Sequence, residues 1–185
     1  MGIWSGSPEA PNSSYFRYLV SKDATWDIRK LNFDSDIALA EKLDNGLISA
    51  TDPNLKKFFA HGGKLILYHG STDPLIAPQN TIDYYNSVSR MNGGKGRDSV
   101  RLFLIPGMDH CAGGAGPSTF DTASALADWL ERGKAPEQII AAHLSHDPIA
   151  PRPGKTRPLC AYPEIAKYKG TGSTDEASSF ACTRE

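Results

Sequence analysis

Two apolar stretches decide the fold of this chain: KLILY at residues 64–68 and VRLFLIP at residues 100–106. Both are mainly aliphatic, and each has the length of a strand that is buried on both faces. A glycine-containing turn follows each stretch, GSTDP at residues 70–74 and GMDHC at residues 107–111. The pattern predicts two buried strands that each end in a turn.

Each turn carries one residue suited to proton chemistry, Asp73 in the first and His110 in the second. Enzymes of the α/β class keep their chemistry at the carboxyl ends of their strands. An aspartate followed by a histidine is also the order of the last two triad members in α/β-hydrolases. The alternative for Asp73 is a turn or helix cap ahead of Pro74. The neighbouring Asp109 is expected to be solvated.

The surrounding pattern places helices and further strands around these two runs. A strand, helix, strand, helix, strand order is typical of a parallel sheet with helices packed on it, so the predicted fold class is α/β. Two or three strands are too few for a doubly wound sheet, which indicates one end of a larger sheet. The expected elements are helices at 34–47, 78–91 and 120–132, a short helix starting at Pro53, a strand at 139–144, a short strand or the end of an earlier element at 15–20, a loop at 1–14, and a compact irregular tail from 145 onward.

Composition excludes several classes of function. The 185 residues are 22% charged and 39% hydrophobic, which is typical of a globular chain with room for one core. A net charge of −1 without a basic stripe argues against a nucleic-acid partner. No apolar run approaches the roughly 18 residues of a membrane span. The first residues lack the basic start and apolar middle of a signal peptide.

The nucleophile that an Asp–His pair would activate is missing from the sequence. No Gly-x-Ser-x-Gly occurs. The nearest pattern, GIWSG at residues 2–6, has its serine one place late, and Ser71 lies inside the turn that carries Asp73. We therefore expect the isolated chain to be catalytically silent, since loss of the triad serine costs about a millionfold in turnover.

Four further strings, in order, make the chain resemble the tannase and feruloyl esterase family. They are GGKLILYHGSTDPLIAPQNTIDYY at 62–85, RLFLIPGMDHCAGGAGPSTFD at 101–121, ALADWLERGKAP at 125–136, and KTRPLCAYP at 155–163, followed by the closing Cys182. The match runs from about residue 52 to the C-terminus, and more loosely from about residue 15. The resemblance implies a serine-type carboxylic ester hydrolase with Asp73 as the triad acid and His110 as the general base.

The resemblance also implies an organisation in three parts. Residues 1–50 correspond to the end of a lid region and its linker, residues 51–145 to an α/β-hydrolase core segment with an incomplete sheet, and residues 146–185 to a disulfide-closed tail. The family's serine precedes its lid, so we expect it upstream of Met1 and expect this chain to be a C-terminal fragment. No metal or cofactor is expected, because the calcium site of the family's lid belongs to a part that this chain does not match.

The three cysteines are odd in number, which in a secreted protein points to a missing partner. In the family, the residue after the catalytic histidine forms a disulfide with the residue before the serine, so the partner of Cys111 is expected upstream of this chain. Cys160 and Cys182 are then implied to pair with each other. The alternative is a zinc site that combines these two cysteines with His143 and His146, although no Cys-x-x-Cys supports it.

The resemblance also implies that the chain is secreted and acts on a small aromatic ester, such as a feruloyl or galloyl ester. No nucleic-acid or membrane partner is expected. A separately supplied N-terminal portion of the same protein is a further candidate partner. The alternative function is a non-catalytic α/β binding or scaffold module that keeps the fold without the reaction.

Overall fold

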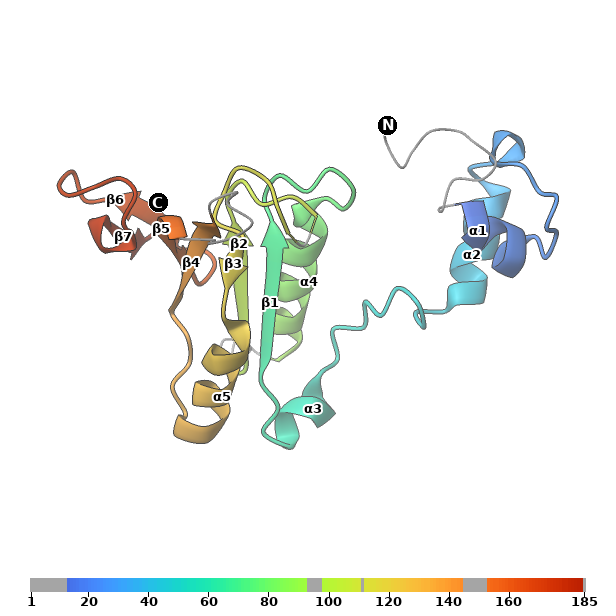
Figure 1. Cartoon of the computed structure of the whole chain (residues 1–185). Coiled ribbons are helices and arrows are strands. Elements are labelled where there is room, and N and C mark those ends of the chain that lie inside the picture. Colours follow the sequence, from blue (N-terminus) through green and yellow to red (C-terminus); the bar gives the residue numbers. More distant parts are fainter. Residues whose placement is uncertain (1–12, 93–97, 111, 145–152, 185) are drawn as a thin grey trace. The chain divides into compact units, whose positions relative to one another are not determined.

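A computed structural model describes residues 13–92, 98–110, 112–144 and 153–184 (Figure 1). The chain divides into two compact units, Met1–Asp52 and Pro53–Glu185. The expected loop at 1–14 falls mostly outside the described residues. The expected division into three parts stays a prediction.

The first unit is helical in its described part. It contains α1 (Ser13–Tyr15), a π-helix (Phe16–Val20), a 3₁₀ turn (Ile28–Lys30) and α2 (Ser35–Asp44). Of the two alternatives for residues 15–20, the short strand is therefore wrong. Phe16 stacks on Trp26 with ring centroids 5.4 Å apart, and the Tyr15 hydroxyl donates to the carbonyl of Ala40 in α2 at 3.3 Å. These contacts hold the segment in a helical turn despite its aromatic, strand-favouring composition.

The second unit is built on a parallel pair of strands, β1 (Leu65–Gly70) and β2 (Val100–Ile105). The two strands pair without a register shift, from Leu65 opposite Val100 to Gly70 opposite Ile105. Helix α4 (Pro78–Met91) connects them and has a proline in its first turn. The short helix before β1 is α3 (Lys56–Ala60), which begins three residues after Pro53 rather than at it.

Alternate residues of β2 supply the cores on its two faces, as the period of a strand requires. Leu102 packs on the α4 side with Tyr85 and Val88. Phe103 and Ile105 pack on the other side, in the cluster that includes residues of β4 and β5. Figure 1 shows α4 on one side of the β1–β2 pair and α5 with β3 and β4 on the other. Coverage of both faces explains why both strands read as continuous apolar runs.

The rest of this unit is antiparallel. Strands β3 (Thr119–Phe120), β4 (Gln138–Leu144) and β5 (Pro153–Cys160) form one sheet in that order, and β6 (Ile165–Tyr168) pairs with β7 (Phe180–Thr183). Helix α5 (Thr122–Arg132) lies between β3 and β4 in the chain. Among the described strands, the predicted parallel pairing holds for β1 and β2, and the remaining pairs are antiparallel, so the expectation that the strand at 139–144 joins a parallel sheet is wrong.

The irregular tail predicted from residue 145 onward is wrong for residues 153–183, where β5, β6 and β7 form. Residues 145–152 lie outside the described residues. The prolines in this region had suggested irregular structure. Pro158 nevertheless lies within β5 opposite Ile140. This is possible because β5 is the terminal strand of its sheet, where a residue without a backbone N–H need not break a ladder to a further strand. A disulfide between Cys160 of β5 and Cys182 of β7, with Cα atoms 5.5 Å apart, ties the two tail sheets together.

Phe103 provides a test of this core. Its side chain is fully buried, so Phe103→Ala is expected to lower the free energy of unfolding by about 3–5 kcal/mol through lost contacts and a residual cavity. The matched control is Ile140→Ala in β4, where the side chain is half exposed and the loss should stay below about 1 kcal/mol. Urea unfolding followed by tryptophan fluorescence measures both, and equal losses would contradict the core assignment.

Candidate active site

The turns after β1 and β2 lie side by side and are joined by hydrogen bonds. Because the two strands run parallel and in register, both turns leave the same end of the pair. The Ser71 amide donates to Ile105 O at 2.9 Å, and the Thr72 amide donates to Met108 O at 3.2 Å. The Thr72 hydroxyl donates to the same Met108 carbonyl at 2.8 Å. These bonds fix the first turn against the second.

Gly70 allows this close approach. A Cβ added to Gly70 would lie 2.2 Å from the carbonyl oxygen of Met108 and 2.4 Å from that of Asp109. Both obstacles are backbone atoms, so no side-chain rotation could relieve the clash. Glycine is therefore required at the last position of β1 if the two turns are to meet.

Asp73 uses its two carboxylate oxygens for different purposes. Oδ1 accepts hydrogen bonds from the amides of Leu75 and Ile76, at 2.8 and 2.9 Å. Oδ2 lies 2.8 Å from Nδ1 of His110. The side chain is almost fully buried. The two roles considered for this residue, turn cap and partner of the histidine, thus coexist in the structure.

The surroundings of Asp73 favour its charged form. Burial by itself raises the pKa of a carboxyl. Hydrogen bonds from the Ile76 amide, from His110 and from the Leu75 amide act in the opposite direction and outweigh burial, so the pKa of Asp73 lies well below its usual range. The carboxylate is consequently available to hold a proton on the nearest nitrogen of His110.

His110 is held on one side and accessible on the other. Its side chain is 46% exposed. With Nδ1–H donating to Asp73, the neutral ring leaves Nε2 without a proton and able to accept one. A cavity of about 240 Å³ is lined by this pair together with Tyr68, His69, Gly70, Ile76 and Met108. Asp109, the other nearby carboxylate, is exposed and accepts a hydrogen bond from the Thr72 hydroxyl at 3.1 Å.

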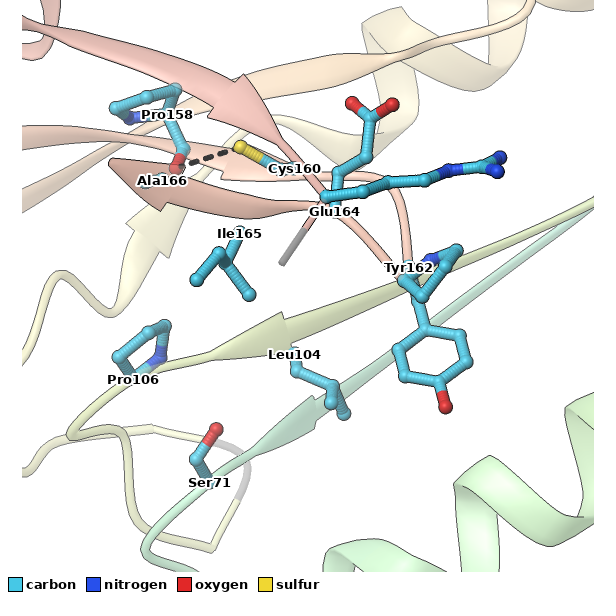
Figure 2. A pocket seen from close by; sticks show the side chains of 11 residues that line it. Ser71, Leu104, Pro106, Pro158, Cys160, Tyr162, Glu164, Ile165 and Ala166 are labelled. Carbon is cyan, nitrogen blue, oxygen red and sulfur yellow. Dashed lines mark hydrogen bonds between the residues drawn. The ribbon is translucent and has the colours of Figure 1, made fainter.

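Ser71 does not face this cavity. It lines a larger pocket of about 530 Å³ between the ends of β1 and β2 and the tail strands. Figure 2 shows this pocket. Ser71 and Leu104 line it from the β1–β2 pair and its turn, and Tyr162 and Ile165 line it from the tail. Ser71, although it belongs to the turn that carries Asp73, therefore lines a different pocket from His110.

The cysteine predictions have different outcomes. Cys160 and Cys182 form a disulfide, the pairing that the family resemblance implies. The alternative zinc site is wrong for these two cysteines, because a disulfide offers no thiolate to a metal. His143, another member of that alternative, has its Nδ1 at 2.9 Å from Gly116 O. Cys111 and His146 lie outside the described residues.

Across the described ranges, no three His, Cys, Asp or Glu side chains gather as a metal site would need. No helix in the same ranges is long and apolar enough to cross a membrane.

One residue of this site was missed from the sequence. His69, the penultimate residue of β1, has Nε2 at 3.2 Å from Oδ2 of Asp73. A histidine four residues before an aspartate gives no recognisable signal by itself, because the turn between them decides whether the side chains meet. Its presence inside an otherwise apolar strand was the only available hint.

The fold and the site define a class of protein: an α/β chain in which a buried carboxylate orients a partly exposed imidazole beside a cavity. The chain belongs to the tannase and feruloyl esterase family, whose model matches residues 5–183. It is 46% identical over 136 residues to mono(2-hydroxyethyl) terephthalate hydrolase of Piscinibacter sakaiensis. This match covers 72% of the present chain and 22% of the hydrolase. It is 34% identical over 191 residues to a probable feruloyl esterase of Arthroderma benhamiae, covering all of this chain and 35% of that protein.

Among solved structures, the chain resembles feruloyl esterase B from Aspergillus oryzae, with a TM-score of 0.83 and 28% sequence identity. This match covers 97% of the present chain and 38% of that one. A tannin acyl hydrolase from Aspergillus niger matches with a TM-score of 0.68 over 92% of the chain. The chain thus spans well under half the length of the relatives it matches.

Gly70→Ala tests the approach of the two turns. The added methyl group is expected to push the Met108–Asp109 backbone away, lower the free energy of unfolding by about 1–3 kcal/mol, and separate Asp73 from His110. Gly154→Ala is the control, because its added Cβ would meet nothing closer than 3.5 Å. Thermal unfolding measures the stability, and NMR signals of the His110 ring report the contact. A Gly70→Ala chain that behaves like the control would refute the clash.

The lowered pKa of Asp73 predicts a specific dependence of stability on pH. The unfolded chain takes up the Asp73 proton near pH 4, whereas the folded chain takes it up only at lower pH. The stabilisation is therefore complete above about pH 5 and is lost as the pH falls toward the folded pKa. We expect the free energy of unfolding to decline more steeply below about pH 5 in the native chain than in Asp73→Asn. Urea titrations at several pH values measure both slopes, and equal slopes would contradict the prediction.

Proposed function

We propose that this chain supplies the acid and the base of a serine-type carboxylic ester hydrolase. The observation that carries the proposal is the contact of 2.8 Å between Oδ2 of Asp73 and Nδ1 of His110. Membership of the tannase and feruloyl esterase family supports the ester as the bond that is cleaved.

His110 acts as the general base in this proposal. Its Nε2 takes the proton of an attacking hydroxyl, so that the oxygen can add to the ester carbonyl, and later returns that proton to the leaving alcohol. Asp73 keeps the ring in the Nδ1–H tautomer and stabilises the imidazolium while it carries both protons. The lowered pKa of Asp73 suits this role, because the carboxylate stays charged at neutral pH.

The attacking serine is proposed to come from a part of the family's fold outside these 185 residues. The sequence contains no Gly-x-Ser-x-Gly. The matched region makes up only 22% of the terephthalate hydrolase and 38% of feruloyl esterase B. Ser71 is a poor substitute because it lines a different pocket from His110. The 185 residues by themselves are therefore proposed to be inactive, and to form the end of a larger α/β-hydrolase sheet preceded by part of a lid.

The proposed substrates are esters of aromatic carboxylic acids. This rests on the relatives, whose names specify feruloyl esters and mono(2-hydroxyethyl) terephthalate, both built on an aromatic acid. An extracellular location is proposed on the strength of the Cys160–Cys182 disulfide, since disulfides persist in oxidising compartments.

The test grafts residues 5–183 onto feruloyl esterase B from Aspergillus oryzae in place of the aligned part. The graft is expected to release ferulate from methyl ferulate, and His110→Ala or Asp73→Ala in it should each lower kcat by about a thousandfold or more. His143→Ala is the matched control, because this histidine contacts a different loop.

Two alternative hypotheses are also tested. The first is tested by the same assay on the isolated chain, with ferulate and gallate esters as substrates. Release of ferulate or gallate that depends on His110 would mean that a serine within these residues attacks the ester. A folded graft that binds ester but hydrolyses none of it would favour a non-catalytic binding module instead.

A further inference from the structure

His69 lies behind the acid–base pair, at the end of β1. Its side chain is only 11% exposed, compared with 46% for His110. Nδ1 lies 2.7 Å from the hydroxyl oxygen of Thr81 in α4. Nε2 lies 3.0 Å from the carbonyl oxygen of Ile76 and 3.2 Å from Oδ2 of Asp73. Both ring nitrogens thus have partners in the protein.

These partners determine where the ring carries its proton. The Ile76 carbonyl and the Asp73 carboxylate can only accept hydrogen bonds, so Nε2 must carry a hydrogen. The Thr81 hydroxyl can donate, so Nδ1 of the neutral ring accepts from it. The surroundings of His69 therefore select the Nε2–H tautomer, the opposite of the one that Asp73 selects in His110.

The contact with Ile76 connects His69 to the acid. The Ile76 amide is one of the two donors to Oδ1 of Asp73, and its carbonyl receives Nε2–H of His69. The ring therefore holds the far end of the turn that fixes the carboxylate. It also places a polarised N–H edge beside Oδ2, the oxygen that faces His110.

We propose that His69, held by Thr81, is a positioning residue that fixes the 73–76 turn so that Asp73 keeps His110 in the Nδ1–H tautomer. This inference rests on the proposed function, which makes that tautomer the working form of the base. His69 is not itself a second general base, because both of its nitrogens are engaged and its ring is largely buried. Its contribution reaches the reaction only through Asp73.

The test uses NMR of the full 185-residue chain labelled with ¹⁵N, compared with His69→Leu and His69→Gln. Glutamine keeps an N–H donor near the position of Nε2, whereas leucine removes it. In His69→Leu we expect the Nδ1–H fraction of neutral His110 to fall, and amide exchange at Leu75 and Ile76 to become about tenfold faster. His69→Gln should restore most of both properties. His143→Leu is the matched control, because it removes another histidine that bonds a loop carbonyl but leaves the Asp73 turn intact.

A purely structural role of His69 would speed exchange throughout β2, β4 and α5 and would not be rescued by glutamine. The proposal is overturned if His69→Leu leaves the His110 tautomer and the Leu75 and Ile76 exchange unchanged, or if glutamine restores neither. If His69→Leu does not fold, Thr81→Val is used to test the proposal in its place. This near-isosteric change removes the donor to Nδ1 and is expected to lower the Nδ1–H fraction of His110, and no change would overturn the inference. None of these measurements needs turnover, so a failed hydrolysis assay leaves the inference open to its own test.

Discussion

The parallel, in-register pairing of β1 with β2 is the constraint on which the candidate site depends. Because Gly70 is opposite Ile105 at the end of the ladder, the two following turns begin at the same level and can exchange hydrogen bonds. A slip of one residue would turn every side chain of β1 to the opposite face. The cores on the two faces of the pair exclude such a slip, so packing far from the site determines the distance between Asp73 and His110.

The site itself is organised around one buried carboxylate. Oδ1 of Asp73 accepts hydrogen bonds from two backbone amides of its own turn. Oδ2 lies near the imidazole rings of His69 and His110. Burial makes this charge costly, and several hydrogen-bond donors compensate for it. Such a carboxylate is held in one orientation, which is what a partner of a general base requires. The two histidines differ in accessibility. His69 is enclosed by protein groups, whereas His110 is partly exposed beside a cavity.

Local sequence signals predicted some elements closely. Helix α4 begins and ends where it was expected, with Pro78 in its first turn and Asn92 as its C-cap. Helix α2 ends earlier than predicted, because Asn45 adopts a left-handed conformation. Thr119 and Phe120 pair with β4 instead of joining α5. The prediction for the tail fails because prolines and glycines are typical of loops, whereas pairing of β5 with β4 and of β6 with β7 makes residues 153–183 a set of strands.

The sequence by itself determined the two buried runs, the turns that follow them, and the residues in those turns that can exchange protons. These features depend on the local composition and order of residues, so they can be predicted from the sequence alone. Only the tertiary structure decided that Asp73 divides its oxygens between its own turn and His110, that Ser71 faces another pocket, and that His69 joins the site. Each of these depends on where side chains point after two strands pair and a helix packs across them, and no spacing along the chain encodes that direction.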